Sequence, residues 1–355
     1  MARRKSVTLN DIAQRLNVST AVVSSVLNNP RNGVWVSKAT RQNIVDLAKE
    51  MGYQPKTRPQ PSARTGVLTG NVAILCLPWY DPLFGKTVSE LCRTLGEWGF
   101  HPFIQVSPDK VASCQAARKL YQEGKADAVI MLGARYHAEE LAVGSVPCVV
   151  IGEVPPELPM WRVSVHNRHG GRLVGEYLWR LGHRRVGTVT VAKAIFAEKE
   201  VAGFRAVWEE HGQELPASWE LCLPEGWDAR RLSEDLPAFL AAVEAQEGTP
   251  LTALFCTGDA LAAPVVRCLK ELGLGIPEEI SVVGFDDSPM LAEFLDPPLT
   301  TVRQPFVQLG HVAAQLLQER LARPEAEPRQ MLLPGELIVR ASCAPPGGKA
   351  LRSNQ

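Results

Sequence analysis

Residues 7–29 read VTLNDIAQRLNVSTAVVSSVLNN, and this stretch decides the fold of the N-terminal part of the chain. Thr8 and the aspartate three residues later have the spacing of a helix capping box, and apolar residues then recur on one helical face. Ser19 can cap a second helix, whose valines form an apolar stripe. Ser37 can cap a third helix that stops at Gly52. The sequence therefore predicts three short helices, with the first two packed as a helix-turn-helix.

The second helix is the candidate for contact with DNA. If its valines face inward, short side chains face outward near its N-terminus: Thr20, Ala21, Ser24 and Ser25. Side chains of this size can approach base edges in the major groove. Free backbone amides around Ser19 point where a phosphate would lie. The alternative is that these serines and threonines are only helix caps and solvated surface.

The charge of the chain is divided between its two parts. Residues 1–64 hold 11 basic and 3 acidic side chains, a net charge of +8, and because the whole chain has 38 of each, residues 65–355 carry −8. A basic segment suits a polyphosphate, because each neutralised phosphate releases condensed counterions. The acidic part would be repelled by DNA, so the charge pattern favours double-stranded DNA as the partner of the first segment.

A proline-rich stretch separates the two parts. Pro55, Pro59 and Pro61 prevent a continuous helix and favour extended chain, which indicates a domain boundary. We therefore predict an all-α helix-turn-helix domain at residues 1–55 and a linker or hinge at residues 56–70. A larger body follows at residues 71–345, with a disordered tail at residues 346–355.

The body has the pattern of an α/β fold. Continuous apolar runs alternate with helical stretches, and the expected strands cover residues 72–77, 102–106, 128–132, 148–151, 185–191, 253–256 and 281–284. Helices are expected between them, for example over residues 88–98, 170–181 and 201–210. This alternation predicts parallel sheets covered by helices on both faces. About 275 residues is large for one sheet, so two subdomains are expected, with ligands at the carboxyl ends of the strands.

Five motifs carry a resemblance to one family. The run DIAQRLNVSTAVVSSVLN resembles the N-terminal signature of LacI/GalR-family transcription regulators, and four further motifs follow in the order of that family: LWRLGHRRVGTV, ISVVGFDD, PPLTTVRQP and LIVRAS. The resemblance implies a homodimer that binds operator DNA and a body of two Rossmann-like lobes, as in type I periplasmic binding proteins. It places crossovers near His166, Arg303 and Arg329. Lobe 1 would then comprise residues 71–166 and 304–329, and lobe 2 residues 167–303 and 330–345.

The resemblance also assigns DNA contacts by position. Thr20, Ala21 and Ser25 match base-reading positions, and Ser19, Ser24 and Asn28 match positions that contact the backbone. Arg31 and Ser37 are candidates for phosphate contacts, and Thr8 and Arg64 complete the predicted DNA-binding set. The hinge departs from the family pattern, because Gly66 stands where a leucine usually wedges into the minor groove.

For the effector, the resemblance matches Phe84 and Trp227 to aromatic walls and Asp286 to a carboxylate that accepts hydrogen bonds. The alternative for both aromatic residues is a place in the lobe core. Asp81 and Arg135 follow expected strand ends, and His166 and Lys199 complete the predicted effector-binding set, which is Asp81, Phe84, Arg135, His166, Lys199, Trp227 and Asp286.

Two departures concern this cleft. Glu200 stands where sugar-binding relatives usually have arginine, and His166 where they usually have aspartate. These changes argue against an ordinary hexose bound in the ordinary way, so either the ligand differs or no small ligand binds. We expect Glu200 to be a solvated helix charge; the alternative is that it accepts hydrogen bonds from a cationic or polyhydroxylated ligand.

Other classes of function lack their motifs. The N-terminus has no apolar signal segment, and no run approaches the roughly twenty apolar residues of a membrane helix. The eight cysteines form no CxxC pair, which is typical of reduced thiols in a cytoplasmic protein. No P-loop, GxSxG elbow or metal-ligand set is present, so we expect no enzyme activity, cofactor or metal.

The sequence as a whole predicts a sequence-specific DNA-binding transcription regulator. We expect a repressor, dimeric on a pseudo-palindromic operator and modulated by a sugar-like or other metabolite in the cleft. One alternative is an effector-independent regulator with a degenerate cleft. The other is a solute-binding or enzymatic body attached to a DNA anchor.

Overall fold

The chain divides into two compact units, Met1–Val67 and Leu68–Gln355. The computed structural model describes residues 9–16, 18–27, 37–51, 69–77, 82–133, 146–154, 158–192 and 195–347. The predicted linker at 56–70 falls outside these ranges except for its last two residues, and so does the tail except for its first two.

The first unit holds the three predicted helices. They are α1, α2 and α3, at Leu9–Leu16, Thr20–Leu27 and Lys38–Glu50. Six of their side chains form a small buried core: Ile12, Ala13, Val23, Val26, Ile44 and Ala48. Because the core draws on all three helices at the spacing of one helical face, the apolar stripes predicted from the sequence are the ones that pack.

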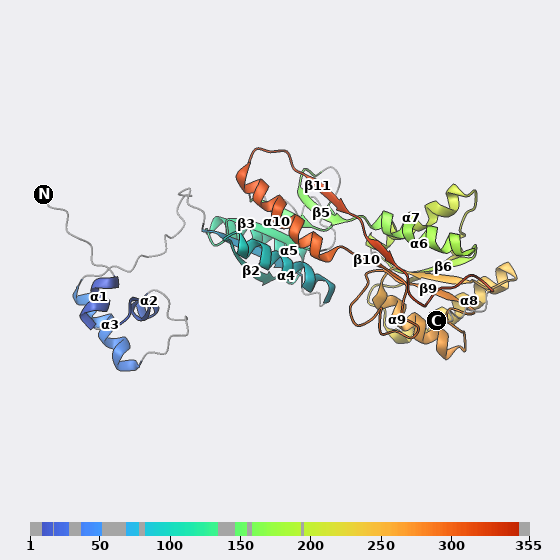
Figure 1. Cartoon of the computed structure of the whole chain (residues 1–355), viewed down its shortest axis with the longest axis horizontal. Coiled ribbons are helices and arrows are strands. Elements are labelled where there is room, and N and C mark those ends of the chain that lie inside the picture. Colours follow the sequence, from blue (N-terminus) through green and yellow to red (C-terminus); the bar gives the residue numbers. More distant parts are fainter. Residues whose placement is uncertain are drawn as a thin grey trace, which may run out of the picture. The chain divides into compact units, whose positions relative to one another are not determined.

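The second unit begins with a lobe built on a six-stranded parallel sheet, named lobe 1 here (Figure 1). The strand order is β11-β5-β4-β3-β1-β2. The strands span Asn71–Cys76 (β1), His101–Val106 (β2), Ala128–Leu132 (β3), Cys148–Ile151 (β4), Trp161–Val165 (β5) and Gln330–Leu333 (β11). The middle strands β3 and β4 are buried along their whole length, as continuous apolar runs between two helical layers require.

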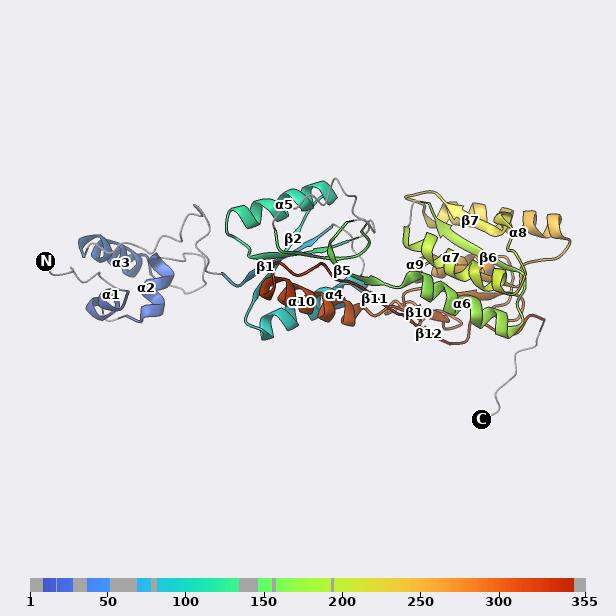
Figure 2. The same ribbon diagram turned by 90° about the horizontal axis from the view of Figure 1, so that it is seen from above.

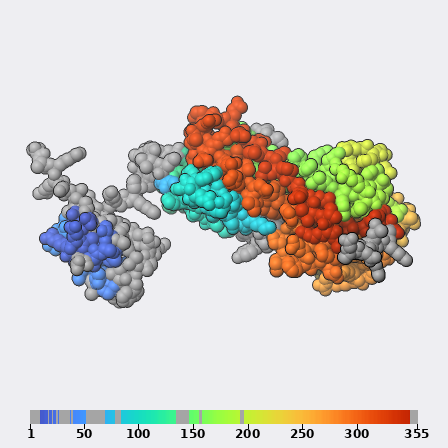
Figure 3. Space-filling view, in the orientation of Figure 1, coloured from blue at the N-terminus to red at the C-terminus, as the bar shows by residue number. Residues whose placement is uncertain are grey.

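Helices cover both faces of the lobe 1 sheet. Figure 2 shows α5, at Lys110–Gln122, on one face and α4 and α10, at Pro82–Glu97 and Phe306–Ala322, on the other. The last two helices lie side by side although they are far apart in sequence (Figure 3). The C-terminal part of the chain therefore returns to lobe 1 and completes its core with residues such as Leu309 and Leu317.

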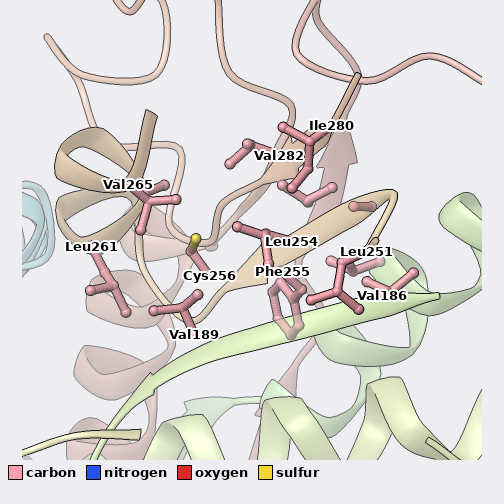
Figure 4. Close-up of a cluster of buried hydrophobic side chains, with 14 of the residues drawn as sticks. Val186, Val189, Leu251, Leu254, Phe255, Cys256, Leu261, Val265, Ile280 and Val282 are labelled. Carbon is pink, nitrogen blue, oxygen red and sulfur yellow. The ribbon is translucent and has the colours of Figure 1, made fainter. Parts of the chain in front are cut away.

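Lobe 2 is a four-stranded parallel sheet in the order β7-β6-β8-β9. Its strands span Val186–Val191 (β6), Glu220–Leu223 (β7), Ala253–Cys256 (β8) and Ser281–Val283 (β9). Its helices span Asn167–Leu181 (α6), Ile195–Glu210 (α7), Ala229–Glu247 (α8) and Asp259–Glu271 (α9), and Ala217–Trp219 forms a 3₁₀ turn. Figure 4 shows the apolar core where β6, β8, β9 and α9 meet, with Phe255 and Val265 among its fully buried side chains.

The chain crosses between the lobes three times. The first two crossings follow the prediction, since α6 starts directly after His166 and β10, at Thr301–Arg303, ends at Arg303. The predicted third crossing, near Arg329, is wrong by four residues. Residues Gln330–Leu333 pair in parallel with β5 and so extend lobe 1 instead of entering lobe 2. The next strand, β12 at Glu336–Ile338, pairs antiparallel with β10.

The missed strand β11 has a physical explanation. Its four residues alternate between exposed and half-buried positions, so they lack the apolar run that marks a buried parallel strand. Only the pairing with β5 makes it a strand. Among the described helices, none is long and apolar enough to cross a membrane.

Candidate functional site

The helix-turn-helix presents the start of α2 to solvent. Ser19 and Thr20 are exposed, while Val23 and Val26 on the opposite side are buried against α1 and α3. The Ser19 hydroxyl accepts a hydrogen bond from the Val22 amide at 3.3 Å, which is the predicted helix cap. Of Ala21, Ser24 and Ser25 the structure describes the backbone, which lies within α2.

The other predicted DNA contacts are described only in part. Ser37 is exposed and its hydroxyl accepts a hydrogen bond from the Thr40 amide at 3.1 Å, so it caps α3 as predicted. Thr8, Asn28, Arg31 and Arg64 lie outside the described residues.

A cavity of about 220 Å³ lies where lobe 1 and lobe 2 meet. Its lining comes from the carboxyl ends of strands, the first turns of helices and two crossover segments. The lining residues are Phe84, Gly133, Ile151, Gly152, Ser164, Val165, Asn167, Phe196, Ala197, Glu200, Thr257, Asp286, Gln304, Phe306 and Leu309. A cavity at the carboxyl ends of parallel strands is where an open α/β fold binds ligands.

Lobe 1 supplies an apolar wall. Phe84 of α4 and Phe306 of α10 meet edge to face, with ring centroids 6.1 Å apart and an interplanar angle of 71°. Ile151 and Val165, at the ends of β4 and β5, and Leu309 extend this wall. Ring faces and aliphatic groups of this kind contact the C–H groups of a ligand or the face of a cation.

Lobe 2 supplies two carboxylates. Glu200 lies in α7 with 2% of its surface exposed, and Asp286 follows β9. Burial, and then repulsion from the Asp286 carboxylate, raise the pKa of Glu200 well above its ordinary value. The expectation that Glu200 is a solvated helix charge is therefore wrong, because α7 turns this side chain into the cavity.

Three polar atoms of the lining are buried without a hydrogen-bond partner among the described residues. They are the Glu200 Oε2, the Asn167 Oδ1 and the Ser164 Oγ. A buried polar atom left unpaired costs about 1–3 kcal/mol, so native proteins rarely keep several of them together without a purpose. Their grouping around one cavity makes this cavity the candidate site for a small molecule.

The loop that carries Asp286 is held in an unfavourable conformation. Asp286 has a φ of 115°, in the left-handed region that favours glycine. Gln304 donates a hydrogen bond from its side-chain amide to Asp286 Oδ1. Buried Asp259 accepts hydrogen bonds from the Ser288 amide and the Thr301 hydroxyl, both at 2.6 Å, and thereby holds the loop against β10.

Burial raises the pKa of Asp259 to about 6, although its two hydrogen bonds favour the ionised form. The carboxyl group is fully buried. Asp259 therefore positions the Asp286 loop at a cost in stability, as is common for strained functional loops.

The predicted effector residues fall into different places. Phe84 and Asp286 both line the interlobe cavity. Lys199 instead pairs with Glu153 of lobe 1 at 2.7 Å, and so links the two lobes beside the cavity. His166 lines a separate hollow between α6 and α7, where its Nδ1 accepts a hydrogen bond from the His169 amide at 3.1 Å.

Trp227 is half-buried and packs against the core of lobe 2, outside the lining of the cavity. A place in the lobe core was the alternative interpretation of Trp227 from the sequence. Asp81 and Arg135 lie outside the described residues.

Several lining residues were not predicted from the sequence. Asn167 and Gln304 directly follow the crossover positions His166 and Arg303, so the crossovers themselves were the signal for them. Ser164 precedes the first crossover in an alternating strand and carried no distinct pattern. Its role depends on a cavity that only the assembled lobes create.

Comparison with known proteins agrees with this architecture. The profile described as "Bacterial regulatory proteins, lacI family" matches residues 8–56, and that of the "Periplasmic binding protein-like domain" matches residues 176–343. The transcriptional regulator reg1 of Streptomyces lividans is 30% identical over 353 residues, which cover 96% of this chain and 98% of the relative. The chain belongs to the LacI family. It is thus a DNA-binding transcription regulator and not an enzyme.

Solved structures of the family have the same fold. The regulator CelR in complex with cellobiose aligns with a TM-score of 0.66 and 26% identity, over 95% of this chain and 99% of CelR. The Lac repressor dimer bound to operator and the anti-inducer ONPF aligns with a TM-score of 0.68 over 96% of this chain and 100% of that one. At 23% identity the second likeness shows the fold alone.

Proposed function

We propose that this LacI-family protein is a cytoplasmic repressor whose affinity for operator DNA is set by a small molecule in the interlobe cavity. The observation that carries the proposal is the group of unpaired buried atoms on Ser164, Asn167 and Glu200 around one cavity. A degenerate cleft would be expected to fill with apolar side chains, because buried unpaired polar groups are costly.

The cavity is suited to control the protein because both lobes contribute to it. A ligand that contacts Phe84 and Phe306 on one side and Glu200 and Asp286 on the other stabilises the arrangement in which the lobes are close. Such differential binding shifts the equilibrium between two lobe arrangements. A coupling free energy of about 1–3 kcal/mol would be enough to switch operator occupancy.

We propose a homodimer on a pseudo-palindromic operator, since a two-fold dimer presents two equal recognition helices. The Lac repressor of the solved complex is a dimer on its operator, which supports this arrangement. Thr20, Ala21 and Ser25 would read bases. Ser19, Ser24 and Asn28 would contact the DNA backbone, and Arg31 and Ser37 its phosphates. Thr8 and Arg64 complete the proposed DNA-binding set.

The test is operator binding by the full-length protein on genomic fragments selected in vitro, with and without a panel of sugars, nucleosides and amines. We expect a symmetric footprint and one compound class that changes the affinity about tenfold, which is about 1.4 kcal/mol. Asp286→Ala should abolish the change, while Asp296→Ala, an exposed carboxylate of lobe 2, should retain it.

Two results would contradict the proposal. A single half-site footprint would exclude the two-fold dimer on DNA. Tight binding that no compound changes would instead identify an effector-independent regulator, which is the second candidate from the sequence.

The recognition helix is tested separately. Ser25→Arg should change the preferred operator sequence, whereas removal of Arg31 should mainly lower the affinity and its salt dependence. An unchanged sequence preference in Ser25→Arg would show that the assigned register of the helix is wrong.

A further inference from the structure

Two of the three crossovers run side by side where the lobes meet (Figure 2). Strand β10 carries the second crossing and β12 follows the third, and the two strands pair antiparallel as a two-stranded ribbon, named the crossover ribbon here. Because the chain passes from one lobe to the other through this ribbon, a change in the arrangement of the lobes must shift or bend it. Contacts that fix the ribbon therefore influence that arrangement.

Asp287 connects the loop after β9 to both strands of the ribbon. Its Oδ2 accepts a hydrogen bond from the Arg303 Nε at 2.7 Å, and its Oδ1 accepts one from the Arg340 Nη2 at 2.6 Å. Arg303 ends β10, and Arg340 lies two residues after the end of β12. Only 11% of the Asp287 side chain and 13% of the Arg340 side chain are exposed. One carboxylate, shielded from water, thus joins lobe 2 to both crossing strands.

The ion pairs of Asp287 are stronger than those around them. Burial by itself would raise the pKa of Asp287, but the hydrogen bonds and charges of Arg340 and Arg303 lower it below its ordinary value. Glu293 and Glu336 also approach these arginines, at 3.6 and 3.9 Å, but both carboxylates are at least 70% exposed. Exposed ion pairs are screened by water and salt, so Asp287 is the main anion that holds the ribbon.

The loop that carries Asp287 is held in a strained conformation. Asp286 and Asp287 have φ values of 115° and 52°, so two consecutive residues other than glycine lie in the left-handed region. Such a conformation persists only where surrounding contacts impose it, and the two arginines bonded to Asp287 supply such contacts. Asp286 lines the interlobe cavity. Because the two aspartates are adjacent, a displacement of the first displaces the second from the ribbon.

We infer that Asp287 is the positioning residue that couples the interlobe cavity to the crossover ribbon and thereby sets the affinity for operator DNA. The inference rests on the proposed function, in which the arrangement of the lobes sets that affinity. Asp287 is not among the described residues that line the cavity, so it acts through Arg303 and Arg340 and not on the ligand. Loss of its ion pairs shifts the equilibrium between lobe arrangements even without a ligand.

The experiment measures operator affinity with no small molecule present. Full-length protein is titrated against a labelled operator fragment selected in vitro with the parent protein, and urea denaturation confirms that each variant is folded under these conditions. We expect Asp287→Asn to change operator affinity about fivefold or more, in either direction, as coupling free energies in proteins allow. Asparagine keeps the size of the side chain and tolerates a positive φ. A merely structural ion pair would alter stability but not the affinity of the folded protein.

Arg303→Gln is a second variant, and it tests the inference alone if Asp287→Asn does not fold. The Arg303 side chain is 51% exposed, so its replacement disturbs the core little. It should change operator affinity in the same direction as Asp287→Asn. The double variant should lie within about a factor of two of Asp287→Asn, because both changes break the same ion pair.

Glu220→Gln is the matched control. Glu220 pairs with Arg205 at 3.3 Å inside lobe 2, and its strand β7 lies at the opposite edge of the sheet from β9. Glu220→Gln should bind operator like the parent protein.

Hydrogen exchange measured by mass spectrometry locates the effect. In Asp287→Asn, amides of β10 and β12 should exchange about tenfold faster than in the parent protein, because the ribbon opens locally. Amides of β3 and β8, in the two lobe sheets, should exchange at the parental rate.

Three results would overturn the inference. The first is that the folded variants of Asp287 and Arg303 bind operator like the parent protein. The second is that Glu220→Gln changes the affinity as much as they do. The third is that exchange in β3 and β8 accelerates as much as exchange in the ribbon.

These outcomes are separate from the test of the proposed function. If no compound changes operator affinity but Asp287→Asn does, the coupling through Asp287 is retained and the effector role is rejected. If one compound changes the affinity equally in the parent protein and in Asp287→Asn, and the variant starts from the parental affinity, the effector role is retained and the coupling is rejected.

Discussion

The two walls of the interlobe cavity differ in polarity: the lobe 1 wall is apolar, and the lobe 2 wall carries two carboxylates. The lobe 1 wall consists of rings and aliphatic side chains that continue the core of that lobe, and Phe306 is 6% exposed. The lobe 2 wall places the carboxylate of Glu200 beside that of Asp286 and keeps the latter on a strained backbone. The first wall stabilises its lobe, whereas the buried carboxylate of Glu200 and its repulsion from Asp286 make the second wall unfavourable to stability.

This difference indicates which wall of the cavity discriminates between ligands. An apolar wall discriminates weakly between ligands, because one methylene group changes binding by only about 1–3 kcal/mol. Buried polar groups reject any ligand that leaves them unpaired. Under the proposed function, lobe 2 would therefore select the molecule that binds, and lobe 1 would contribute shape and contact area.

The largest effect should come from the helix packing that holds Glu200 in place. A Cβ at Gly171 of α6 would lie 1.8 Å from the Glu200 carbonyl oxygen, so Gly171→Ala must push α6 and α7 apart. We expect a loss of more than about 3 kcal/mol in the free energy of unfolding, measured by urea denaturation.

Gly96 in α4 of lobe 1 is the matched control, since a Cβ there meets nothing within 4 Å. Gly96→Ala should stabilise the protein by up to about 1 kcal/mol through helix propensity. Equal midpoints for the two variants would show that the carboxylate wall does not depend on close packing of α6 and α7.

A second prediction concerns the cost of Glu200 itself. Its folded-state pKa is raised, so the folded protein holds this proton over a pH range in which the unfolded chain has lost it. The free energy of unfolding should therefore fall as pH rises from the ordinary carboxyl range to the folded pKa. Glu200→Gln should lack the part of this fall that comes from Glu200. At about pH 8 its free energy of unfolding should exceed that of the parent protein by about 1–3 kcal/mol.

The measurement is urea denaturation at about pH 5 and about pH 8. Exposed Glu198→Gln should follow the parent protein at both values. Because the pKa of Asp259 is also raised, part of the fall should persist in Glu200→Gln. A parent-like pH dependence in that variant would mean that Glu200 is not buried as an acid.

A smaller effect is expected from the aromatic wall. Phe84→Leu removes a ring face but keeps an apolar side chain, so binding of the effector proposed above should weaken by a factor of about three to ten, or about 0.5–1.5 kcal/mol. Calorimetry with the compound that changes operator affinity measures this. Phe103→Leu, in the core on the other sheet face of lobe 1, should leave the affinity unchanged. If Phe84→Leu and Phe103→Leu bind the ligand with equal affinity, the Phe84 ring does not contribute to binding.

The smallest effect concerns the ion pair between the lobes. Lys199→Met removes the pair with Glu153, but Arg162 still contacts Glu153 at 3.3 Å. The free energy of unfolding should change by less than about 1 kcal/mol. Ligand affinity should fall by a factor of about two to five, because one contact between the lobes beside the cavity is lost.

Lys270→Met is the control, since Lys270 pairs with Asp296 inside lobe 2. Lys270→Met should leave ligand affinity unchanged. If Lys199→Met also leaves affinity unchanged, the pair does not contribute to bringing the lobes together.

Local signals in the sequence were sufficient for the first unit. Ser19 and Ser37 cap α2 and α3 through hydrogen bonds to residues three positions away, and the apolar stripes repeat at helical spacing. The buried strands of the body were equally visible, because β3 and β4 are apolar throughout. Interactions over three or four residues, and burial on both faces, both leave a direct pattern in the sequence.

The cavity is different because its properties depend on residues far apart in the chain. The position after β9 predicted Asp286, but its partner Gln304 comes from a crossover 18 residues later. The sequence predicts a surface charge at Glu200, since nothing in α7 alone shows that its side chain is buried at a cavity lined by both lobes. The strand β11 likewise exists only through its pairing with β5, more than 160 residues away.

The sequence by itself determined the helix-turn-helix, the two-lobed α/β body and the family, because caps, periodic apolar residues and motif order are local properties of the chain. Only the tertiary structure decided that Glu200 faces the cavity and Lys199 the other lobe, although the two residues are adjacent. The physical reason is that burial and charge pairing depend on which elements meet in space. Here α7 lies against α6 at Gly171 and against lobe 1 at Glu153, and neither contact can be read from α7 alone.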